Sequence, residues 1–100
     1  MKMYILIKDD IDIGHALLTS AHASLAAYCE FCDEPDFEDW FENSFKKVIC
    51  KVNEEEFEKA KEYPDNLVMT ESSLDDQEVA IVFCPRKEWP KFFNFLKLYR

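Results

Sequence analysis

The sequence predicts a single α/β domain in which helices cover both faces of a mixed four-stranded sheet. Its 100 residues are enough for one hydrophobic core but not for two, so we expect one domain over residues 1–100. Short apolar runs typical of buried strands alternate with segments that suit helices. This alternation favours a central sheet with helices packed against it from either side.

The first third of the chain contains a predicted strand and the longest predicted helix. Tyr4 to Ile7 is a continuous apolar run, as found in strands that are covered on both faces. An acidic turn follows, and Gly14 is a flexible entry to an Ala-rich helix from about His15 to Glu30. Because apolar residues fall nearly all the way round this helix, we expect it to be buried on most sides.

The rest of the chain supplies three more strands and three more helices. They are predicted as a short helix at Asp36 to Asn43, a strand at Phe45 to Val52, a helix at Glu54 to Tyr63, strands at Leu67 to Thr70 and Glu78 to Cys84, and a helix from Pro90 to the C-terminus. Asn53 is a favourable N-cap for the Glu-rich helix that follows it. Pro85 ends the last strand, and Pro90 fits the first turn of a helix.

The charge balance disfavours nucleic acid as a partner. The net charge is -9, and no Lys or Arg occurs between Lys8 and Lys46, whereas affinity for phosphate backbones comes largely from basic side chains. The N-terminal apolar run has only four residues, too few for a signal peptide, and no stretch approaches a membrane span. We therefore expect a cytoplasmic protein that does not bind membranes.

The four cysteines are interpreted as reduced thiols. Cys29 and Cys32 form a lone C-x-x-C without a second pair or a nearby histidine, which is a weak zinc signal. They fall at the end of a helix, where the helix dipole does not lower a thiol pKa. Cys50 and Cys84 lie in predicted strands. We accordingly expect no bound metal and no cofactor.

Both histidines lie on the long predicted helix and form the best candidate site. Because steps of three and four residues return to the same helix face, His15, Thr19 and His22 form one stripe. The histidines are about 10.5 Å apart along the axis, too far to bind one metal ion together. Either imidazole can act as a general base. The alternative is that His15 is simply solvated and His22 is a satisfied, half-buried core residue.

Acidic side chains are expected beside this stripe. In open sheets, sites lie beyond the carboxyl ends of the strands. The first strand leads to the segment Asp9 to His15, and the third leads to Glu71 to Asp76 if it runs parallel to the first. Carboxylates next to imidazoles form a plausible acid-base set, although these acids also suit solvated loops.

These residues resemble the pattern of the type II peptidyl-tRNA hydrolases over essentially the whole chain. In that family a strand is followed by Asp-Leu-x-Met and by Gly-Lys-x-x-x-Gln-x-x-His-Ala, which opens a long Ala-rich helix. The matching positions here are Asp10, Ile11, Asp12, Ile13, Gly14, His15, Thr19, His22 and Ala23. Lys46 to Val52 resembles the family's Lys-Lys-Ile-Val-x-Lys-Val strand, and the ending, with a strand to Pro85 and a helix to Leu98, also fits.

The resemblance implies a candidate site that departs from the family pattern. His15 takes the place of the lysine and Thr19 that of the glutamine, while His22 is retained. The loop Asp-Ala-Gly-x-Thr-Gln falls on Glu71 to Asp76, so that Glu71 replaces the aspartate and Asp75 the threonine. A histidine makes the donor dependent on pH, and Asp75 adds negative charge where phosphate has to be accommodated. The implied site is His15, Thr19, His22, Glu71 and Asp75.

Two functions follow from this comparison. The first is a diverged family member with weak or lost peptidyl-tRNA hydrolysis that serves as a binding domain for a small ligand or a protein. The second is a working esterase in which His22 and Glu71 do acid-base work and His15 replaces the lysine. The resemblance also implies a homodimer, for which the many aromatic residues would leave apolar surface.

Overall fold

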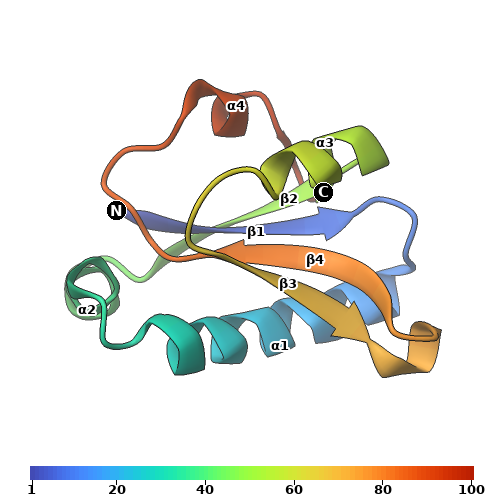
Figure 1. Ribbon diagram of the computed structural model, residues 1–100, viewed down its shortest axis with the longest axis horizontal. Helices are drawn as coiled ribbons and strands as arrows, with labels where there is room; N and C mark the ends of the chain where they lie inside the picture. The colour runs from blue at the N-terminus through green and yellow to red at the C-terminus, as the bar shows by residue number, and fades with distance from the viewer.

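A mixed sheet of five strands forms the centre of the computed structural model, which describes residues 1–100 (Figure 1). Along the chain the elements are β1 (Lys2–Lys8), α1 (Ile13–Phe31), α2 (Pro35–Asn43), β2 (Lys46–Val52), α3 (Glu54–Ala60), β3 (Asn66–Glu71), the 3₁₀ helix η1 (Ser72–Leu74), β4 (Gln77–Phe83), α4 (Lys91–Asn94) and β5 (Lys97–Leu98). Helices α1 and α3 and the first four strands lie where the sequence predicts them, with ends that differ by up to three residues.

The strand directions bring three strand ends to one edge of the sheet. The strand order is β3-β4-β1-β2-β5, with β2 parallel to β1 and with β4 antiparallel to both β1 and β3. Strands β1, β2 and β3 therefore run in the same direction, and they end together at Lys8, Val52 and Glu71. We call this side of the molecule the carboxyl edge. The condition that the third strand runs parallel to the first is therefore met.

The core consists of two apolar layers, one on each face of the sheet. Helices α1 and α2 pack on one face, where Ile5, Ala23 and Trp40 are among the buried residues. Helices α3 and α4 cover the other face around Phe57 and Phe83. Figure 1 shows α1 below the sheet and α3 and α4 above it, so the prediction of helices on both faces is confirmed.

The prediction of four strands is wrong, because the C-terminal residues form a fifth. Helix α4 ends at Asn94, and Lys97–Leu98 pairs antiparallel with Cys50 and Lys51 of β2. The amide of Tyr99 also donates to the carbonyl of Ile49 at 2.9 Å. Free backbone groups on the outer side of β2 thus capture the tail. A two-residue strand has no periodicity to reveal it, and the spacing of the nearby aromatic residues imitates a helix.

Helix α1 is not buried on most sides as predicted. Only the face with Ala16, Thr19, Ala23, Ala27 and Phe31 is buried. Leu17 and Leu25 are each 66% exposed, and Ile13, Leu18 and Tyr28 are exposed as well. The helix packs over β4, β1 and β3, and no further layer covers its outer side. A helix of this composition therefore leaves an uncharged apolar face in solvent. No helix of the molecule is both long and apolar enough to cross a membrane.

Thiol reactivity should separate the four cysteines into two pairs. Burial raises the pKa of Cys50 to about 11 and that of Cys84 to about 12, so both remain protonated at pH 8. Cys29 is exposed and Cys32 is partly exposed. Iodoacetamide at pH 8 is expected to modify only Cys29 and Cys32 in the folded protein. Peptide mapping checks this, with the protein in guanidinium chloride, where all four thiols should react, as the control.

Candidate functional site

The candidate site lies at the carboxyl edge, where the start of α1 meets the turn that follows β3. Figure 1 shows the first turn of α1 beside η1, although the two segments are far apart in the sequence. A chain of hydrogen bonds joins Asp12, His15, Ser73 and Glu71 across this junction. We call these four residues the polar chain.

The first link of the polar chain is the N-terminal cap of α1. Asp12 accepts from the backbone amide of His15 through Oδ1 at 2.9 Å, and its Oδ2 lies 2.7 Å from His15 Nδ1. The amide and ring hydrogen bonds from His15 hold the pKa of Asp12 below its usual value. The only glycine, Gly14, leaves room for this cap, since a Cβ atom there would lie 3.3 Å from Asp12 Oδ1. Asp12 thus orients the imidazole.

The second and third links pass through Ser73. His15 Nε2 lies 3.0 Å from Ser73 Oγ, and Ser73 Oγ lies 2.7 Å from Glu71 Oε2. The backbone amide of Ser73 also donates to Glu71 Oε2, at 3.1 Å. These hydrogen bonds from Ser73, followed by the positive charges of His15 and His22, lower the pKa of Glu71. Glu71 therefore remains a carboxylate at neutral pH, and its main part is to hold Ser73.

The state of His15 decides which way the Ser73 hydroxyl points. Because a carboxylate faces Nδ1, that nitrogen carries a proton. When His15 is charged, Nε2 donates to Ser73 Oγ, and the hydroxyl donates to Glu71. When His15 is neutral, Nε2 accepts, and the single hydroxyl proton has two competing acceptors. His15 is thus placed to take a proton from Ser73 as a general base.

The structure brings together some of the predicted site residues but not all. His15 and Glu71 belong to the polar chain, and His22 is exposed close enough for its charge to act on Glu71. Thr19 is only 2% exposed, and its hydroxyl has no hydrogen-bond partner. Asp75 is exposed in a left-handed turn, with a φ of 55°, and its side chain makes no hydrogen bond to the polar chain. Ser73 thus joins His15 to Glu71, whereas Thr19 and Asp75 take no part in the polar chain.

The alternative readings of the two histidines do not hold. His15 is not merely solvated, because both ring nitrogens have partners, and His22 is exposed rather than half buried in the core. Asp12 and Ser73 were not among the site residues predicted from the sequence. Asp12 stands at N-cap spacing before His15, which was a usable signal. Ser73 offered none, since its histidine partner lies 58 positions away.

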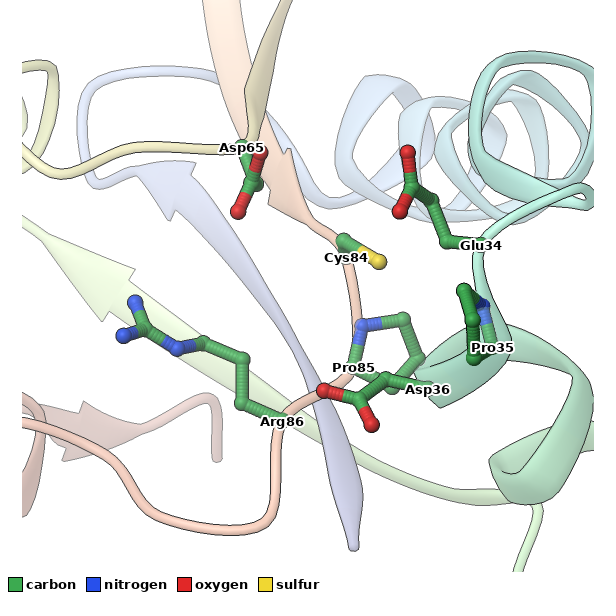
Figure 2. A pocket seen from close by; sticks show the side chains of 7 residues that line it. All are labelled: Glu34, Pro35, Asp36, Asp65, Cys84, Pro85 and Arg86. Atoms are coloured by element: carbon green, nitrogen blue, oxygen red, sulfur yellow. The ribbon is translucent and has the colours of Figure 1, made fainter.

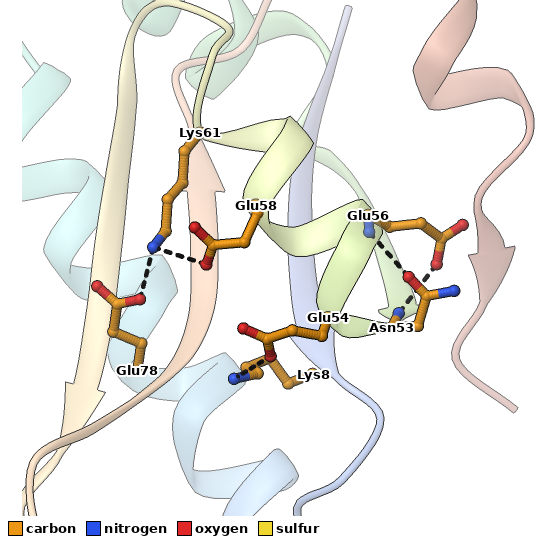
Figure 3. A network of polar contacts seen from close by, with 7 residues as sticks. All are labelled: Lys8, Asn53, Glu54, Glu56, Glu58, Lys61 and Glu78. Carbon is orange, nitrogen blue, oxygen red and sulfur yellow. Dashed lines mark hydrogen bonds and ion pairs between the residues drawn. The ribbon is translucent and has the colours of Figure 1, made fainter.

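Negative charge dominates the carboxyl edge. Carboxylates gather at the ends of three strands, which are Asp9, Asp10 and Asp12 after β1, Glu54 and Glu55 after β2, Glu71 as the last residue of β3, and Asp75 and Asp76 after it. Lys8 pairs with Glu54 at 2.6 Å, and Lys61 pairs with both Glu58 and Glu78 (Figure 3). Lys51 lies over the ring of Tyr99. The lysines nearby are thus mostly engaged with carboxylates or an aromatic ring.

Basic side chains gather at the other end of the sheet instead. Lys2 lies opposite Lys46 in the pairing of β1 with β2, and it also forms a bridge with Arg86. Strand β1 has seven residues, so this group lies about 20 Å from the carboxyl edge. These three cations therefore lie far from the polar chain, at the opposite end of the sheet.

The same far end holds a polar cavity of about 350 Å³ (Figure 2). Arg86 lines it together with the carboxylates of Glu34, Asp36 and Asp65, and Cys84 faces it as well. It contains no predicted site residue. Nowhere in the molecule are three or more His, Cys, Asp or Glu side chains arranged to hold a metal ion.

The fold and the polar chain together define an α/β protein with side chains suited to acid-base chemistry at the carboxyl ends of parallel strands. The family model described as peptidyl-tRNA hydrolase PTH2 matches residues 1–84, and the chain therefore belongs to this family. The match ends just after β4, so that α4 and β5 lie outside it. No curated protein matches the chain.

Replacing Glu71 should destabilise the folded protein by an amount that depends on pH. Because its folded pKa is below the usual 4.5, the carboxylate stabilises the folded state above that pH, and this stabilisation is lost as the pH falls through the folded value. Glu71→Gln should therefore lower the free energy of unfolding at pH 7, and the difference should shrink below pH 4.5. Urea unfolding at both pH values measures it. Glu62→Gln, at an exposed carboxylate without an ion pair, is the control.

Proposed function

We propose that this protein is a diverged member of its family in which peptidyl-tRNA hydrolysis is weak or lost and which serves as a binding or interaction domain. The acidity of the carboxyl edge carries this proposal. The residues that correspond to the family site lie at the acidic carboxyl edge, whereas Lys2, Lys46 and Arg86 lie at the opposite end. Charge therefore works against a tRNA at the site.

The physical reason is the cost of bringing phosphates to this edge. A tRNA whose ester reached His15 would place its terminal phosphates near Asp12, Asp75 and Asp76, where like charges repel. Contacts with phosphates stabilise a complex through basic side chains, which release counterions. The group at Lys2 is about 20 Å away, at the other end of β1. Negative charge at the site thus opposes the binding of tRNA, which has to precede hydrolysis in the family reaction.

A second candidate function is favoured by the polar chain. It is a working carboxylic ester hydrolase in which His15 takes the place of the family lysine and His22 and Glu71 do acid-base work. His15 is held by Asp12 at 2.7 Å and faces Ser73 at 3.0 Å, which is the geometry of an oriented base. Since Glu71 is ionised and engaged by Ser73, proton transfer at this site falls chiefly to the histidines.

Release of peptide from an N-blocked aminoacyl-tRNA tests both candidates. The purified protein is compared with His22→Ala and His15→Ala across a series of salt concentrations. We expect no turnover above that of the two variants at physiological salt, because the carboxyl edge repels the substrate. Turnover that is lost in either variant and weakened by salt would contradict the proposal and establish a tRNA esterase.

The interaction surface we propose is the exposed face of α1, and its partner is a second copy of the chain. No charged residue other than histidine occurs from Ile13 to Cys29, although 33% of the chain is Asp, Glu, Lys or Arg. Leu17 and Leu25 project from this face, and apolar cavities flank it at both ends. Lys47 lies at one end and Asp12 at the other. A two-fold axis across α1 brings these unlike charges together.

Substitution on this face should separate the two copies. Leu25→Asp would place a charge within the proposed interface, and we expect a monomer. Phe95→Asp is the control, because Phe95 is 80% exposed after α4, away from α1. Analytical ultracentrifugation should show a dimer for the natural chain and for Phe95→Asp. A natural chain that remains monomeric at every concentration would disprove the homodimer.

A further inference from the structure

We infer that Ser73 Oγ is a nucleophile, activated by His15 and Asp12, which accepts an acyl group from an ester. This deepens the second candidate function, the ester hydrolase, and goes beyond it, because it needs no tRNA and assigns a covalent step to a residue outside the predicted site. The observation that carries it is the continuity of the hydrogen bonds from Asp12 through His15 to Ser73.

The three side chains meet the geometric requirements of an activated serine. A serine becomes nucleophilic when a base lies within hydrogen-bond reach and a third group orients that base. His15 Nε2 lies 3.0 Å from Ser73 Oγ, and Asp12 Oδ2 lies 2.7 Å from the other ring nitrogen. The carboxylate is ionised, as its lowered pKa requires, so it stabilises the imidazolium that forms when the serine proton is taken up.

Glu71 and the backbone keep the serine in place during this step. The amide of Ser73 donates to Glu71 Oε2 at 3.1 Å, independently of the hydroxyl. When the hydroxyl turns from Glu71 to His15, the amide hydrogen bond still anchors the residue. Asp12 is anchored separately as the cap of α1, a helix of 19 residues. The nucleophile and its base are therefore held by regular elements on both sides of the junction.

The reaction balances with the groups present and with water. Ser73 Oγ forms a bond to the acyl carbon while its proton passes to His15 Nε2. The ester C–O bond breaks, and the departing alcohol takes that proton. Water then attacks the acyl group on Ser73 with His15 again as base, which releases the carboxylic acid and restores the hydroxyl.

Exposure and charge define the class of substrate. Ser73 is exposed and the His15 side chain is 29% exposed, so an ester in solution reaches both. The neighbouring carboxylates of Asp75 and Asp76 repel anions. The structure thus points to a neutral or cationic carboxylic ester.

Three departures from the family pattern occur at residues that form the proposed activated serine and its surroundings. His15 stands at the lysine position, Ser73 at the glycine position and Glu71 at the aspartate position. These three residues contact one another directly, through distances of 3.0 and 2.7 Å. A lysine is charged at neutral pH and cannot take a proton, and a glycine has no hydroxyl. Only the combination found here makes an activated serine.

A fluorophosphonate probe tests the inference directly, because it reacts covalently with activated serines. The intact mass of the natural chain should increase by one adduct, and peptide mapping should place it on Ser73. Ser73→Ala should give no adduct, and His15→Ala should react about 100-fold more slowly, since general-base catalysis contributes at least that much. Ser72→Ala is the matched control, because Ser72 is the exposed neighbour in the same 3₁₀ helix, and its rate should equal that of the natural chain.

The outcomes separate this inference from the proposed function. The assignment of Ser73 as a nucleophile is wrong if the natural chain stays unmodified or if the adduct forms equally in Ser73→Ala. Neither result affects the proposals on tRNA and on the homodimer. Circular dichroism of each variant confirms that it is folded. A burst of one equivalent of p-nitrophenol from p-nitrophenyl acetate, absent in Ser73→Ala, would support the acyl intermediate independently.

Discussion

The parallel direction of β1 and β3 is the constraint on which the rest of the site depends. It arises because β4 pairs antiparallel with both strands and lies between them. The start of α1 and the turn after β3 therefore meet at one edge, although 58 positions separate His15 from Ser73. If β3 ran the other way, Glu71 and Ser73 would lie at the far end of the sheet, near Arg86. No local feature of either segment could then bring the imidazole and the hydroxyl together.

Much of this arrangement was predictable from the sequence because it depends on local signals. Apolar runs mark β1 and β4, Asn53 marks the start of α3 through a capping box with Glu56, and the ends of β1 and β3 carry polar residues. The fifth strand was missed because its two residues are placed by pairing with β2, and not by their own pattern. Ser73 was missed for the same reason, because its histidine partner is brought close only by the folded sheet.

The composition of helix α1 was the reason for the wrong prediction that this helix is buried on most sides. Its composition suits a buried helix, but burial needs a second layer, and a chain of 100 residues has too few elements to build one over α1. The sheet covers the Ala-rich side, where small residues allow close approach. Leu17, Leu25 and Tyr28 remain on the outer side. These exposed apolar residues are the surface on which the proposed homodimer rests.

The protonation state of His15 decides between two arrangements of the polar chain. When His15 is charged, its ring donates to Ser73, and the Ser73 hydroxyl is directed to Glu71. Nucleophilic chemistry at Ser73 needs the neutral form, so only one of the two arrangements can react. Binding of a neutral or cationic molecule, which displaces water from the edge, would change the balance between the charged and neutral forms of His15. The site is thus governed by the proton on one imidazole, a control that a lysine at position 15 could not provide.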